Sequence, residues 1–315
     1  MVGEELEAED MVKSPSPGPL EDSGDENASP SRIEALIHLL GDDSPKILGS
    51  VWRHLERIGS GAVPFVREAA RNSPDPAVRR EARRFVTEWQ RRAVIERWEA
   101  FCATGDVSLE EGVLLVSRSE YPAAGEAECL DRLEEYAGVL RRRLATARTA
   151  DAAFQKLAQF LGGELGFSGT DVDILCPADS YLHRVLERRR GLPILLSVVY
   201  LLVARRLDLE LVGVSMPRHF VVKYRTSAGE RFLDPFHGGK VLERADCVKF
   251  LERSGIVFQE RLLGAASDRA ILSRILGNLL RAYHARQDRS RLARVLGMLR
   301  QLEKGPCPPM SASRG

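Results

Sequence analysis

His219 and Asp234 are the two side chains of this 315-residue chain whose types and spacing best suit acid–base chemistry. His219 opens the alternating segment HFVVKYR, and Asp234 lies near the end of the next such segment, RFLDPF. This alternation predicts two half-buried strands, and the intervening TSAG predicts a hairpin turn. If Arg225 pairs with Glu230, His219 and Asp234 project from one sheet face as diagonal neighbours, ~7–8 Å apart and within reach of a hydrogen bond. The aspartate would then fix the imidazole tautomer, as in a catalytic triad; alternatively, the pair only stabilises the hairpin.

A triad also needs a nucleophile, and Cys176 is the candidate that completes the chain order Cys–His–Asp. It precedes Pro177, and proline is a favourable first residue of a helix. The positive end of a helix favours the reactive thiolate form of a cysteine. Against this stands the common role of a free cysteine as a small buried hydrophobic residue. Ser197, inside an apolar segment, has no evident base other than His219 and is a weaker candidate.

A metal site would draw on the side chains of His183, His219, Asp234 and His237. Their separations in the sequence lack the compact spacing of ligand motifs such as those that bind zinc. The five cysteines likewise show no CxxC spacing, which argues against a zinc ribbon and against a disulfide framework. We therefore predict no metal and no cofactor, and the odd number of cysteines favours a reducing compartment such as the cytoplasm.

The charge balance gives no support for nucleic acid as a partner, because 46 basic and 45 acidic residues leave a net charge of +1. The arginine-rich run from Arg281 to Arg300 is interpreted as a solvated helix surface. The acidic start of the chain has no basic and apolar segments of a secretory signal. The longest apolar run, LPILLSVVYLLVA, is too short to span a bilayer and predicts a buried helix instead.

Helices dominate the rest of the pattern, so the predicted fold class is α+β and predominantly helical, with a small antiparallel sheet. The acidic, aliphatic-poor start cannot bury enough surface to order itself. The segment after it resembles HEAT repeats, because Pro45 aligns with Pro76 in two similar helical stretches. The predicted parts are a disordered tail at 1–30, HEAT-like helices at 31–97, an α+β domain at 98–265, a tetratricopeptide-like helix pair at 266–304 and a disordered tail at 305–315.

Residues 100–300 resemble a known family through several motifs taken together. These are RRxGxP in RRRGLP, an HF pair after a proline in MPRHF, DPFxGG in DPFHGG and RxLxNL in RILGNL. The combination is similar to the SirB-type branch of the transglutaminase-like superfamily. That resemblance implies a papain-like core, in which a central helix runs into a small antiparallel sheet.

The resemblance also assigns positions to the candidate residues. His219 and Asp234 occupy the superfamily's histidine and aspartate positions, whereas the cysteine position falls at about Pro193, where no nucleophile exists. Two residues depart from the pattern of the branch: Arg218 replaces the usual glycine before the histidine, and Asp179 replaces the usual asparagine before SYL. Arg218 beside Asp234 would quench or rearrange such a site.

These observations predict a non-catalytic transglutaminase-like protein that acts as a protein-interaction or regulatory module. A protein is the expected partner, with no membrane contact and no nucleic acid. The alternative is a cryptic cysteine-type hydrolase or acyltransferase that uses His219 and Asp234. Its nucleophile would be Cys176 or a group carried by the substrate.

Overall fold

The fold was described from a computed structural model of the chain, which covers residues 29–105, 107–170 and 176–305. The tails predicted to be disordered lie almost entirely outside these ranges. The described chain divides into two compact units, one up to Trp89 and one from Gln90 onward. The helix that contains this boundary, α4, runs without interruption from Pro76 to Ala103. No glycine or proline occurs between these helix ends to break it.

The first unit consists of helices around a small apolar core. Trp52 of α2 meets Phe85 of α4 edge-on, with ring centroids 5.3 Å apart. A proline occupies one of the first two positions of α1, α2 and α3, where its missing N–H costs no hydrogen bond. The HEAT-like classification of this unit stays a prediction. Its elements are α1 (Pro30–His38), η1 (Leu39–Gly41), α2 (Pro45–Ile58), η2 (Gly59–Gly61), α3 (Val63–Asn72) and the start of α4.

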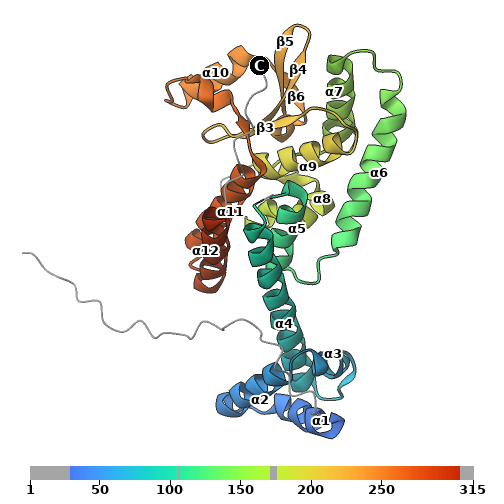
Figure 1. Cartoon of the computed structure of the whole chain (residues 1–315), viewed down its shortest axis with the longest axis vertical. Coiled ribbons are helices and arrows are strands. Elements are labelled where there is room, and N and C mark those ends of the chain that lie inside the picture. Colours follow the sequence, from blue (N-terminus) through green and yellow to red (C-terminus); the bar gives the residue numbers. More distant parts are fainter. Residues whose placement is uncertain (1–28, 106, 171–175, 306–315) are drawn as a thin grey trace, which may run out of the picture. The chain divides into compact units, whose positions relative to one another are not determined.

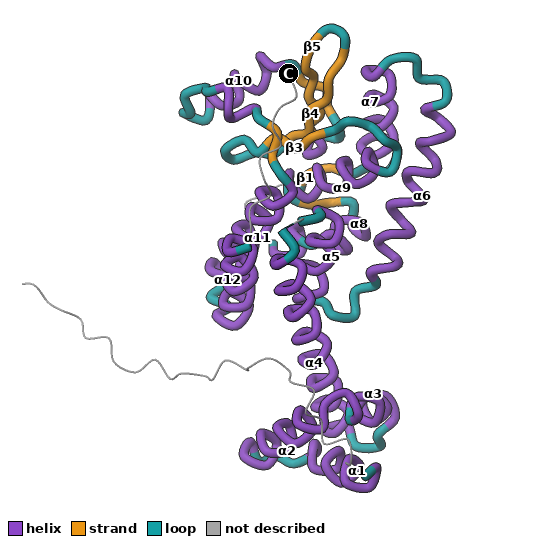
Figure 2. The backbone as a smooth tube through the Cα atoms, in the orientation of Figure 1, coloured by secondary structure: helices purple, strands orange, loops and turns teal. Residues whose placement is uncertain are grey.

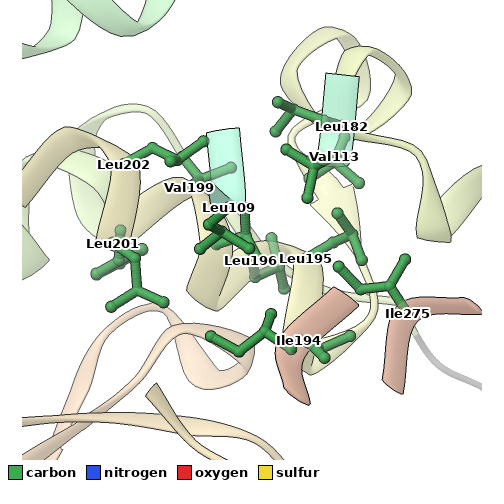
Figure 3. Close-up of a cluster of buried hydrophobic side chains, with 14 of the residues drawn as sticks. Leu109, Val113, Leu182, Ile194, Leu195, Leu196, Val199, Leu201, Leu202 and Ile275 are labelled. Atoms are coloured by element: carbon green, nitrogen blue, oxygen red, sulfur yellow. The ribbon is translucent and has the colours of Figure 1, made fainter. Parts of the chain in front are cut away.

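The second unit is built around helix α9 (Pro193–Arg205), whose residues from Ile194 to Ala204 are all buried. Leu109 and Val113 of α5, Leu182 of α8 and Ile275 of α11 surround the start of this helix (Figure 3). The apolar run that predicted a buried helix is therefore confirmed. The other helices of the unit are α5 (Leu109–Glu120), α6 (Glu126–Leu144), α7 (Ala150–Ala158), α8 (Leu182–Arg188), α10 (Arg244–Arg253), α11 (Asp268–Ala285) and α12 (Arg289–Lys304), with short turns η3 (Gln159–Glu164), η4 (Pro177–Ser180), η5 (Pro235–His237) and η6 (Glu260–Leu263).

A five-stranded antiparallel sheet has the strand order β6-β5-β4-β3-β7. It packs against α9 on one face and α10 on the other, and Figure 2 shows its strands β3, β4 and β5. Arg225 pairs with Glu230, which confirms the predicted register. Because side chains alternate along a strand, Val222 packs in the core with α9 whereas Val221 packs with α10. The strands are β3 (Val212–Val214), β4 (Val221–Thr226), β5 (Gly229–Asp234), β6 (Lys240–Leu242) and β7 (Ala265–Ala266); β1 (Ser168–Gly169) and β2 (Arg190–Gly191) form a separate parallel pair.

The last two helices, α11 and α12, pack against each other near the C-terminal end of the described chain (Figure 1). Trp98 of α4 is fully buried beside them, and its Nε1–H donates a hydrogen bond of 3.1 Å to the backbone oxygen of Met298 in α12. The α+β fold, mostly helical with a small antiparallel sheet, is as predicted. The tetratricopeptide-like character of the helix pair stays a prediction. Within the described ranges, every helix is too short or too polar to cross a membrane.

Candidate functional site

His219 and Asp234 lie on the sheet face that α10 covers, where the register places them. His219 lies two residues before β4 begins at Val221, and Asp234 is the last residue of β5. Nε2 of His219 and Oδ2 of Asp234 are 2.9 Å apart, and both residues are buried, with 8% and 4% exposure. The predicted hydrogen bond is therefore present. A neutral His219 that donates from Nε2 keeps Nδ1 as a proton acceptor.

His237 is a third member of this group, which the sequence reasoning did not connect to the pair. The short turn η5 carries it back over β5, so that its Nδ1 lies 2.7 Å from Oδ2 of Asp234. The backbone N–H of Phe236 donates to the other carboxylate oxygen at 3.1 Å. Burial alone would raise the pKa of Asp234, but the hydrogen bonds and charges of the two histidines outweigh it, and the pKa lies below the ordinary 3.8.

Three of the four residues considered for a metal site do come together. One ligand atom each from His219, Asp234 and His237 lies within 4.8 Å of the others, so this set could hold one metal ion. The three residues are therefore close together in space, although their spacing in the sequence does not match a ligand motif. His183 lies apart from them, in edge-on contact with Tyr121, and burial lowers its pKa to about 4.

A cleft of about 780 Å³ opens beside His219 and His237. Its fourteen lining residues come from the start of α9, the segment 217–220, the turn η5, Phe250 of α10 and one face of α11. Pro193 is the first residue of α9 and lies in the lining. All fourteen residues are described, and none of them carries a thiol, hydroxyl, amine or carboxylate. The histidine pair therefore faces a cleft whose walls contain no common nucleophile.

Comparison of the sequence with known proteins identifies the family of this chain. A sequence profile of the transglutaminase-like superfamily matches residues 127–277, which contain α9, His219 and Asp234. A UPF0162 protein of Xylella fastidiosa is 34% identical over 217 residues, which are 65% of this chain and 76% of the relative. Protein SirB1 of Salmonella typhimurium is 29% identical over 109 residues, 34% of this chain and 40% of SirB1. The chain belongs to the SirB-type branch of the transglutaminase-like superfamily.

The SirB-type similarity extends beyond bacterial proteins. F-box only protein 21 of Homo sapiens is 32% identical over 125 residues, which are 37% of this chain and 19% of that protein. No solved structure gives a significant match. The resemblance inferred from the motifs is thus confirmed at the level of the family, and the role of each site residue stays a prediction.

Cys176, the candidate nucleophile, is not part of the cleft beside His219 and His237. It lies half-buried directly before η4, and its Sγ makes no hydrogen bond to His219. The prediction that Pro177 starts a helical turn is correct, but η4 has only four residues. Cys176 lines neither this cleft nor the smaller cavity on the Asp234 side of His219, so the structure does not bring the predicted triad together.

Two other residues, Cys247 and Ser197, also carry a group that could act as a nucleophile. Cys247 of α10 lines a second cavity together with His219 and Asp234, a proximity that sequence reasoning missed. It is fully buried, and burial, with the charges of Asp246 and Asp234, raises its pKa to about 12. The thiol is therefore protonated at neutral pH. Ser197 is also fully buried, and its hydroxyl lies 3.5 Å from the backbone oxygen of Phe220.

The two departures from the SirB-type pattern have separate explanations. Asp179 is buried in η4, and its Oδ1 accepts a hydrogen bond of 2.9 Å from Arg188. Its backbone oxygen accepts the N–H of Leu192, which fixes the start of α9. Arg218 does not contact Asp234, contrary to our expectation, because the described partners of that carboxylate are the two histidines and Phe236. Arg218 lines the cleft instead.

Arg218 has a φ of +65°, the left-handed conformation that favours glycine. A side chain costs roughly 1–2 kcal/mol in this conformation, partly offset by the greater freedom of glycine in the unfolded chain. We expect Arg218→Gly to raise the free energy of unfolding by about 0.5–1 kcal/mol in urea denaturation. As a control, Arg225→Gly within β4 should lower it, because glycine weakens a strand. An Arg218→Gly variant that is less stable than the wild type would contradict this explanation.

Proposed function

We propose that this SirB-type protein is non-catalytic and binds a protein partner in the cleft beside His219. The observation that carries the proposal is the composition of the cleft wall. The wall contains His219 but has Pro193 at the position that the family resemblance assigns to the cysteine, and none of its residues carries a thiol or hydroxyl. A concave, mostly apolar surface with a few convergent polar groups is typical of a binding site. We also propose a cytoplasmic location, supported by the four described cysteines, all of which are free.

Gly277 of α11 offers a direct test, because it lines the cleft and has open space where a side chain would begin. A photo-crosslinking phenylalanine derivative at position 277 should link covalently to a bound partner in cells that produce the protein. Mass spectrometry would identify the linked peptide. Gly297 of α12 is the matched control, because it is a helical glycine with equally open space but lies outside the cleft lining. Equal products from both positions would reject binding in the cleft.

One observation favours a second candidate, the cryptic hydrolase or acyltransferase. His219 lines the cleft while Asp234 fixes its orientation, so a nucleophile carried by the substrate could lose its proton to this imidazole. This candidate requires hydrolysis of an ester or amide that disappears in His219→Ala. If Cys176 served as the nucleophile, its alkylation by iodoacetamide would also slow in His219→Ala. We expect neither effect, and peptide mass spectrometry resolves the labelling of each cysteine.

A further inference from the structure

Three arginines in the cleft lack a carboxylate partner. Arg218, Arg274 and Arg281 all belong to the lining, and none of them forms an ion pair within the described ranges. Other arginines of the same helix pair behave differently: Arg291 and Arg294 contact the carboxylate of Glu120 at 2.6 and 2.9 Å. Guanidinium groups gathered without counter-charge repel one another and attract an anion.

Two of these arginines are held in place by their neighbours on α11. Arg274, Asn278 and Arg281 lie on one helix face, because residues three and four apart are neighbours on a helix. Asn278 is buried, and its side-chain oxygen accepts a hydrogen bond from Arg281. Arg281 lies two turns after Arg274 and lines the same cleft, and burial together with the charge of Arg281 lowers the pKa of Arg274. The face is therefore a preorganised cationic surface.

Arg274 also ties α11 to the segment that leads into β4. Its Nη1 donates to Ser215 Oγ and to the backbone oxygen of Met216, both at 2.7 Å. Its Nη2 donates to the backbone oxygen of His219 at 3.0 Å. These bonds leave the outward N–H groups of Arg218 and Arg281 as the donors for a ligand, since both side chains are exposed.

The remaining lining specifies the other part of the ligand. Phe236 and Phe250, both partly exposed, give the cleft an aromatic wall, and no acidic residue is part of the lining. The nearby carboxylate of Asp234 is already engaged by His219 and His237. The uncapped N-terminus of α9, at Leu192–Ile194, adds partial positive charge. This charge pattern disfavours a cation in the cleft and favours an oxyanion attached to an apolar group.

We propose that the cleft recognises an acidic peptide of the partner protein, with Arg218 and Arg281 pairing its carboxylates and the phenylalanines contacting its apolar side chains. Arginine suits this role because its planar fork matches a carboxylate with two parallel hydrogen bonds. The inference rests on the proposed function, since it names the chemistry of the partner that occupies the cleft.

Selection from a random twelve-residue phage peptide library against the full chain tests the inference. We expect the wild type to enrich peptides in which Asp or Glu alternates with apolar residues. Gly277→Trp, which fills the cleft, should abolish this enrichment, and Gly297→Trp should not. Peptides that depend on the cleft but lack acidic residues would overturn this inference and leave the proposed function standing. Absence of any cleft-dependent enrichment would reject both.

The affinity of an enriched peptide, measured by fluorescence polarisation, then identifies the groups that recognise it. Arg218→Gln and Arg281→Gln should each weaken binding roughly tenfold, as expected for loss of a charge-assisted hydrogen bond. Arg225→Gln is the matched control, because Arg225 is exposed and carries the same charge but lies outside the cleft. Equal losses in all three variants would show a non-specific charge effect and overturn the inference. Tighter binding when phosphoserine replaces the acidic residues would overturn the choice of carboxylate.

Discussion

Asp234→Ala should lower the free energy of unfolding by about 3 kcal/mol, since hydrogen bonds to a charged group contribute about 1.5–3 kcal/mol each. The substitution removes the acceptor for His219, His237 and the backbone N–H of Phe236. Urea unfolding followed by circular dichroism measures the loss. Asp131→Ala on the exposed face of α6 is the control and should change stability by less than about 0.5 kcal/mol. Equal stability of the two variants would show that the buried network contributes nothing.

The same carboxylate predicts a dependence of stability on pH. Its pKa is lowered in the folded state, so the ionised form stabilises the fold above the pKa of the unfolded chain, about 3.9. This contribution is lost as the pH falls through the lower pKa of the folded state. The stability difference between the wild type and Asp234→Asn should therefore be largest near neutral pH and decline below about pH 4. A difference that stays constant down to pH 3 would contradict this interpretation.

Gly162→Ala should be comparably damaging, because a Cβ at this position would lie 1.9 Å from the backbone oxygen of Gly238. Backbone cannot rotate away as a flexible side chain can, so η3 and the turn after His237 must separate. Overpacking of this kind costs about 1–3 kcal/mol, and we expect a value near the upper limit. The shift would also displace His237 from Asp234, so the pH dependence described above should weaken in this variant.

The adjacent glycine provides the control for this prediction. A Cβ on Gly163 would meet only Cγ of Gln159, at an ordinary 3.9 Å. Gly163→Ala should therefore be neutral or slightly stabilising, since alanine loses less conformational freedom on folding than glycine. The two variants differ by one position in the sequence and have the same composition. If both had the same stability, close packing of the two glycine-rich turns would not hold this part of the fold.

Local periodicity was enough to predict the geometry of the His219–Asp234 pair. Period-two alternation and a short turn fix which residues share a face, and Arg225 opposite Glu230 set the register. His237 was missed because its position depends on η5, where the carboxylate of Asp234 accepts the N–H of Phe236 and the chain bends back. The segment DPFHGG contains both residues, so an aspartate-capped turn was the available signal.

The rest of the site could not be predicted because it depends on contacts between residues that are far apart in the sequence. Cys176 does precede a helical turn, but whether it reaches His219 depends on the packing of η4 against α8 and α11. The basic residues from Arg281 onward were interpreted as a solvated surface. The structure instead pairs Arg291 with Glu120 and places Arg281 in the cleft. The spacing of Arg274, Asn278 and Arg281 shows a shared helix face, but only tertiary packing shows what that face borders.

The hydrogen bond from Trp98 to Met298 has a consequence for the synthesis of the protein. The two residues are 200 positions apart, so the second unit cannot complete its core until α12 has left the ribosome. At roughly 5–20 residues per second, Trp98 waits about 10–40 seconds for its partner. The first unit depends on contacts among its own early helices and can fold during this interval. The apolar face of α4 that bears Trp98 therefore stays exposed in the nascent chain until α12 emerges.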